Sequence, residues 1–160
     1  MKTVGKWMSR CLASASVILW YAVIFGFSAQ DGEESGSLSG AIAKAVVRLF
    51  GGDPEGKTRE TLETVIRKCA HMTEFAILAL LLLWAVCVWT GARNIKAYAA
   101  ALLITVCLAA LDEFHQTFVP DRAGRPLDVL IDSCGALAAL GAVWIITHGK
   151  SSSESSESIT

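Results

Sequence analysis

Four apolar stretches, each close to the length of a membrane-crossing helix, constrain this chain more than any other feature. About 20 helical residues, each rising about 1.5 Å, cross a hydrocarbon core of about 30 Å. The stretches cover residues 11–29, 72–90, 97–112 and 127–147. They are continuous rather than alternating and rich in leucine and alanine, which favours helices over the strands of a barrel. The sequence therefore predicts an all-α membrane protein, a four-transmembrane-helix bundle.

The composition supports this class of protein and excludes others. Hydrophobic residues make up 53% of the 160 residues and charged residues 18%, and the mean hydropathy is +0.49. The 14 basic and 15 acidic side chains nearly balance, so no nucleic acid is expected as a partner, whereas membrane lipids are. The five cysteines are scattered without a C-x-x-C pair, which indicates small apolar residues rather than a disulfide framework or a zinc knuckle.

The first apolar stretch sets the expected orientation. Lys2, Lys6 and Arg10 precede it, and no basic residue follows until Lys44, so the amino terminus is expected in the cytoplasm. Because the chain crosses the membrane four times, the carboxyl terminus is expected on the same side. Counted over the whole chain, however, more basic residues would then lie outside than inside, which opposes this orientation. A cleaved signal peptide is the alternative, but the apolar part is long and Phe27 stands where a cleavage motif requires a small residue.

The segments outside the spans are predicted from their polar and breaking residues. Residues 30–40 are Gly/Ser-rich and are expected to form an exposed loop. A short amphipathic helix follows in this first outer loop, with Ile42, Val46, Leu49 and Phe50 at helical spacing, and it either lies on the membrane surface or caps the bundle. A new helix is expected from about Thr58 into the second span. Residues 1–148 form the membrane domain, and residues 149–160 are predicted to be a disordered polar tail.

Polar side chains that are unusual for membrane helices collect at one face of the predicted bundle. They lie at helical spacings where spans begin or end, and in the loop between the third and fourth spans. The candidate binding residues are Gln30, Arg67, Glu74, Asp112, Gln116, Arg122, Arg125, Asp128 and Asp132. A charge at the middle of a membrane helix costs about 2.5–3.5 kcal/mol, so these groups must face one another or a water-filled pocket. The arginines are the expected partners of the carboxylates.

The same cluster contains residue types suited to catalysis and to metal binding. His71 and Glu113 are the candidate catalytic residues, as proton carriers in general acid–base chemistry. Two imidazoles and three carboxylates could also bind zinc or a similar ion, from His71, Glu74, Asp112, His115 and Asp132. Neither H-E-x-x-H nor another known metalloenzyme pattern is present, so the sequence motifs predict no metal and no cofactor. Gly135 and Ala139 continue one stripe of the fourth span as small residues that let helices approach.

Four short blocks in this order resemble the signature of VanZ-like membrane proteins. They are Phe27-Ser-Ala-Gln30, Arg67-Lys-Cys-Ala-His71 with Glu74-Phe75, Asp112-Glu-Phe-His-Gln116 with Arg122, and Asp128-Val-Leu-Ile-Asp132-Ser-Cys-Gly135. The resemblance covers residues 27–140 and departs at Asp132, where similar members have Asn. It implies a small bacterial multi-pass protein of the plasma membrane, from a family whose founding member is associated with low-level teicoplanin resistance. It implies no settled biochemical activity.

Three functions follow from these features. The first is a non-enzymatic envelope protein whose polar pocket at the outer membrane face binds an anionic or lipid-linked headgroup, such as a lipid-linked cell-wall intermediate. The second is an intramembrane enzyme that uses acid–base residues on the same kind of substrate. The third is a structural ion-pair network that holds the helices together. The oligomeric state is not determined by these patterns.

Overall fold

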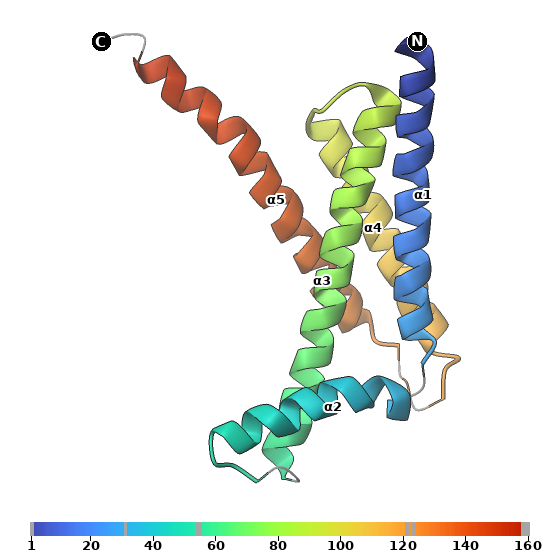
Figure 1. Ribbon diagram of the computed structural model, residues 1–160, viewed down its shortest axis with the longest axis vertical. Coiled ribbons are helices and arrows are strands. Elements are labelled where there is room, and N and C mark those ends of the chain that lie inside the picture. Colours follow the sequence, from blue (N-terminus) through green and yellow to red (C-terminus); the bar gives the residue numbers. More distant parts are fainter. Residues whose placement is uncertain (1, 31, 54–55, 121, 123, 158–160) are drawn as a thin grey trace.

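Helices account for all the regular secondary structure in the part of the chain that the structure describes. The structure is a computed structural model, and it describes residues 2–30, 32–53, 56–120, 122 and 124–157. The elements are α1 (Lys2–Ser28), α2 (Gly32–Leu49), α3 (Lys57–Thr90), α4 (Ile95–Gln116) and α5 (Pro126–Glu157) (Figure 1). The all-α fold class is therefore confirmed.

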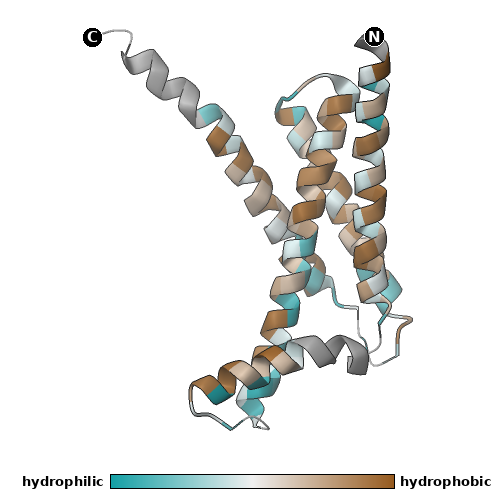
Figure 2. Cartoon of the chain, viewed as in Figure 1, coloured by the Kyte–Doolittle hydropathy of each residue, from teal (hydrophilic) through white to brown (hydrophobic). Residues whose placement is uncertain are grey.

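Four of these helices are long and apolar enough to cross a membrane. The spans are Val4–Ser28, Lys57–Thr90, Ile95–Gln116 and Pro126–His148, one in each predicted place. Large apolar side chains such as Ile18, Leu103 and Ile145 are exposed on the bundle surface, as contact with lipid requires. Hydrophobic residues cover the bundle, whereas hydrophilic ones gather near its lower end (Figure 2). The chain is therefore a multi-pass membrane protein.

Helix α3 is the centre of the bundle. It packs against α1, α2, α4 and α5, and it contributes Phe75, Leu78 and Leu82 to the buried core. Its 34 residues correspond to about 50 Å, which exceeds the thickness of the hydrocarbon core. The first turns of α3 therefore lie outside the apolar layer, as expected from the predicted helix start near Thr58.

The prediction of a loop at residues 30–40 is wrong from Gly32 onward, because α2 already begins there. Tertiary packing explains the difference: α2 lies across the N-terminal part of α3, with Gly40 next to the side chains of Arg59 and Glu63. Helix propensity alone would not favour a Gly/Ser-rich segment, and this packing overrides it.

The predicted amphipathic helix is present, but its buried face differs from the expected one. Ala43 and Val47 are buried, whereas Ile42, Leu49 and Phe50 are exposed. The helix thus caps the lower end of the bundle through its small residues (Figure 1). Contact of the exposed apolar side chains with a membrane surface stays a prediction. The predicted disordered tail begins within α5, which continues to Glu157, and residues 158–160 lie outside the described residues.

Gly135 brings α5 into close contact with α3. A Cβ atom at this position would lie 2.5 Å from the carbonyl oxygen of Met72 and 2.5 Å from its Cγ atom. Only hydrogen fits there, so the predicted role of Gly135 as a small residue between helices is confirmed. Beyond this crossing, α5 diverges from α3 (Figure 1).

We expect Gly135→Ala to destabilise the bundle by about 1–3 kcal/mol, because the added methyl group must displace the backbone of α3. Gly141→Ala is the matched control on the same helix: nothing lies within 4 Å of a Cβ atom there, so alanine is neutral or slightly stabilising. Thermal denaturation midpoints in detergent compare the two variants. Equal midpoints would contradict the tight crossing.

Candidate functional site

The polar residues from all four spans meet at the end of the bundle where α1 and α4 end and α5 begins (Figure 1). Ser28 comes from the last turn of α1, and His71 from the part of α3 that precedes its long apolar run. Asp112 lies one turn before the end of α4, and Asp132 lies in the second turn of α5. The helix ends therefore place these side chains at one level.

Asp112 is the centre of a buried hydrogen-bond network. Its side chain is fully buried, and its Oδ2 atom accepts hydrogen bonds from Ser28 Oγ at 2.7 Å and from Gln116 Nε2 at 2.9 Å. The Nε2 atom of His71 lies 3.2 Å from the same oxygen. The network joins α1, α3 and α4, because each contributes at least one partner.

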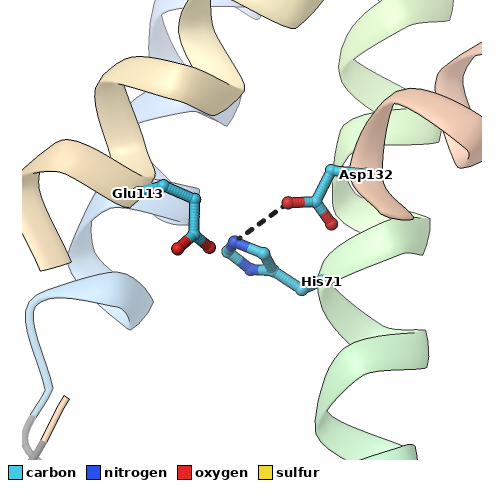
Figure 3. A group of neighbouring side chains, drawn as sticks. All are labelled: His71, Glu113 and Asp132. Carbon is cyan, nitrogen blue, oxygen red and sulfur yellow. Dashed lines mark ion pairs between the residues drawn. The ribbon is translucent and has the colours of Figure 1, made fainter. Parts of the chain in front are cut away.

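His71 extends this network to α5. Its Nδ1 atom lies 3.2 Å from Glu74 Oε2 on the same helix, and its Nε2 atom lies 3.7 Å from Asp132 Oδ2. The ring points between the carboxylates of Glu113 on α4 and Asp132 on α5 (Figure 3). One imidazole is thus surrounded by carboxylates from three helices.

The connection between α4 and α5 folds back over the end of α4. The backbone N–H of Arg125 donates to Glu113 Oε2 at 2.8 Å. A Cβ atom at Gly124 would come within 2.0 Å of the Glu113 carbonyl oxygen, so only glycine permits this close approach. Arg122 reaches Gln116 Oε1 at 3.5 Å and the Phe27 carbonyl oxygen at 3.3 Å. These contacts position two arginines beside the network.

A cavity of about 330 Å³ lies between this connection and α3. It is open to the exterior on one side, and charged and polar side chains form most of its wall. The lining residues are Thr64, Arg67, Lys68, His71, Glu113, Gln116, Arg122, Arg125, Asp128, Ile131 and Asp132.

Most of the predicted site residues border this cavity, including both candidate proton carriers, His71 and Glu113. Glu74 and Asp112 are not among the lining residues: they contact His71 in the network behind the cavity wall. Gln30 is half-buried at the end of α1 and is not a lining residue either. The structure therefore separates the predicted cluster into a buried network and a cavity.

Lys68 is the main residue that sequence reasoning missed. It borders the cavity and forms an ion pair with Asp128, for which an arginine had been expected. Asp112 and Asp132 both have ion-pair contacts with His71. Lys68 precedes His71 by three residues, so the helical spacing that selected Arg67 and His71 would also have placed Lys68 near this face.

The arrangement supports two kinds of chemistry. Guanidinium and ammonium groups around an open cavity bind phosphate or carboxylate groups, and arginine does so with two parallel hydrogen bonds. An imidazole beside several carboxylates transfers protons or holds a cation.

The fold and the site together define a class: multi-pass helical membrane proteins with a charged cavity at one end of the bundle. The sequence model of the VanZ/LLP1 family matches residues 14–147, and the chain belongs to this family. The family prediction is therefore confirmed. No curated protein and no solved structure matches the chain significantly.

We expect Ser28→Ala to lower the free energy of unfolding by about 1.5–3 kcal/mol, because the buried Asp112 carboxylate loses a hydrogen-bond donor. Ser16→Ala on the same helix is the control, since the Ser16 hydroxyl donates to the Leu12 carbonyl oxygen of its own helix. Unfolding by SDS titration in mixed micelles measures both variants. A similar effect of the two substitutions would refute a role of the network in holding α1 to α4.

Proposed function

We propose that the cavity binds the phosphate-bearing headgroup of an anionic lipid at the outer face of the bacterial plasma membrane. A lipid-linked cell-wall intermediate is the proposed natural ligand. The observation that carries this proposal is the convergence of Arg67, Arg122 and Arg125 on one open cavity at the end of the spans.

The charges on the cavity wall suit a phosphate group. Three arginines and Lys68, which forms an ion pair with Asp128, border the cavity. Arg125 is exposed and Arg67 is half-buried, so the guanidinium groups are accessible from water. Arginine keeps its charge in such a setting and matches the geometry of phosphate oxygens. The neighbouring carboxylates are suited to accept hydrogen bonds from sugar hydroxyls next to the phosphate.

The depth of the cavity supports a lipid as the source of that phosphate. The cavity lies where α1 and α4 end and where α5 begins, which is the level at which an apolar span meets the headgroup layer. A lipid in the same leaflet therefore brings its phosphate to the arginines without leaving the bilayer. A binding role at the outer leaflet also fits the teicoplanin association that the family resemblance implies.

The buried network and the cavity favour different functions. Ser28 and Gln116 donate to one oxygen of the Asp112 carboxylate and so join α1 to α4, which is a structural role. The side chains of Arg67 and Arg125 take no part in these hydrogen bonds to Asp112, which favours binding over a purely structural network. A second candidate function, proton transfer on the bound lipid, is favoured by the position of His71 and Glu113 on the same wall. Mass spectrometry of the bound lipid separates the two, because only an enzyme changes its mass.

We expect the purified protein in nanodiscs to bind a polyprenyl phosphate or phosphatidylglycerol in preference to phosphatidylcholine. Arg67→Gln and Arg125→Gln should each weaken this binding about 10-fold to 100-fold, because a charged hydrogen bond contributes about 1.5–3 kcal/mol. Native mass spectrometry measures the bound lipid.

Arg93→Gln is the matched control for lipid binding, because Arg93 is exposed in the connection between α3 and α4, away from the cavity, and its Nε atom donates to Tyr98 Oη. Binding that is unchanged in the cavity variants, or reduced equally in all three, would contradict the proposed cavity.

We expect the cavity to face the outside of the cell, because the basic residues that flank the first span favour a cytoplasmic amino terminus. In a cysteine-free background, Lys57→Cys should react with a membrane-impermeant maleimide in intact cells, whereas Arg93→Cys should react only after permeabilisation. Lys57 begins α3 at the cavity end, and Arg93 lies in the connection after α3. The reverse pattern would place the cavity in the cytoplasm and exclude an outer-leaflet ligand.

A further inference from the structure

We infer that His71, Glu113 and Asp132 form a binding site for one divalent transition-metal ion, such as Zn²⁺ or Mn²⁺, at the inner wall of the cavity. This inference goes beyond headgroup binding and does not depend on it. It rests on the position of these three side chains and on a buried carboxylate oxygen without a hydrogen bond.

The three side chains come from three different helices and meet at one point. One ligand atom of each lies within 4.8 Å of the others. Glu113 and Asp132 are buried and His71 is half-buried, with its ring directed between the two carboxylates (Figure 3). Metal–ligand bonds of about 2.1 Å hold donor atoms at most about 4.2 Å apart. The donor atoms, now within 4.8 Å of one another, would therefore have to move closer to hold one ion.

The contacts of His71 indicate which ring nitrogen faces the ion. A carboxylate only accepts hydrogen bonds, so Nδ1, at 3.2 Å from Glu74 Oε2, carries a hydrogen. The Nε2 atom lies 3.2 Å from an oxygen of Asp112 and 3.7 Å from an oxygen of Asp132. Two carboxylates this close to Nε2 require a positive partner there, which is either a second ring proton or a metal ion. Metal-binding histidines commonly donate their other N–H to a carboxylate, as His71 does to Glu74.

Asp132 supplies an independent indication of a ligand. Its side chain is 2% exposed, and within the described part of the chain its buried Oδ2 atom has no hydrogen-bond partner. Buried polar atoms in folded proteins are nearly always satisfied. This oxygen is directed toward His71 (Figure 3). A metal ion at the meeting point would satisfy it.

The donor set and the local charge define the class of ion. One imidazole nitrogen with carboxylate oxygens suits Zn²⁺, Mn²⁺ or Fe²⁺ rather than Ca²⁺, which prefers oxygen ligands alone. Two ligating carboxylates balance a divalent charge. All three residues border the cavity, so an ion reaches the site from water and keeps a coordination position directed toward the cavity.

The test uses the full-length protein in detergent, stripped with EDTA and returned to buffer without phosphate lipids. Titration with Zn²⁺ or Mn²⁺, followed by elemental analysis after desalting, should give one ion per chain and a higher denaturation midpoint. Glu113→Gln and Asp132→Asn should fold, as judged by size-exclusion chromatography, and should lose at least 10-fold in metal affinity.

His148→Ala is the control for adventitious binding, because His148 is exposed near the opposite end of α5. It should bind the ion like the unmodified protein. The inference is overturned if the unmodified protein binds no stoichiometric ion, which would mean that a proton alone occupies Nε2. It is also overturned if both carboxylate variants bind as well as the unmodified protein. Lipid binding is absent from this assay, so its failure would leave the metal result unaffected.

Discussion

The burial of a single carboxylate within a membrane bundle determines how the rest of the structure is arranged. Asp112 has no access to water, and an unpaired charge at this depth would be too costly for so small a bundle. Its partners come from the end of α1, the middle of α3 and the last turn of α4. These contacts set the relative heights of three helices, and the close contact at Gly135 adds the fourth.

The spans and the convergence of polar groups were predictable because they follow from length and from helical spacing. A run of about 20 apolar residues is stable in lipid as a helix. Residues four apart, such as Arg67 and His71, share one face of any helix, so their proximity follows from the sequence alone. The pairing of Lys68 with Asp128 and the helical start at Gly32 were not predictable. Both depend on how α3 packs against α5 and α2, and such long-range contacts leave no local pattern in the sequence.

The hydrogen-bond network around Asp112 lies behind the wall of the charged cavity, so one small bundle contains both a stabilising network and a cavity open to water. The network centres on the buried Asp112 and joins helices, whereas the cavity wall is completed by a connection that folds back at Gly124. The side chains of Arg67 and Arg125 border the cavity without taking part in the hydrogen bonds to Asp112. His71 belongs to both regions and connects the bundle core with whatever occupies the cavity.

The divergence of α5 beyond Gly135 makes the two halves of the molecule mechanically unequal. On the cavity side four helices are packed together, whereas farther along α5 an apolar crevice of about 290 Å³ separates it from α4, and Trp144 meets Tyr98 across it. Helices adapt to a change in bilayer thickness partly by tilting, so we expect the outer part of α5 to respond to such a change before the four-helix packing at the charged end does.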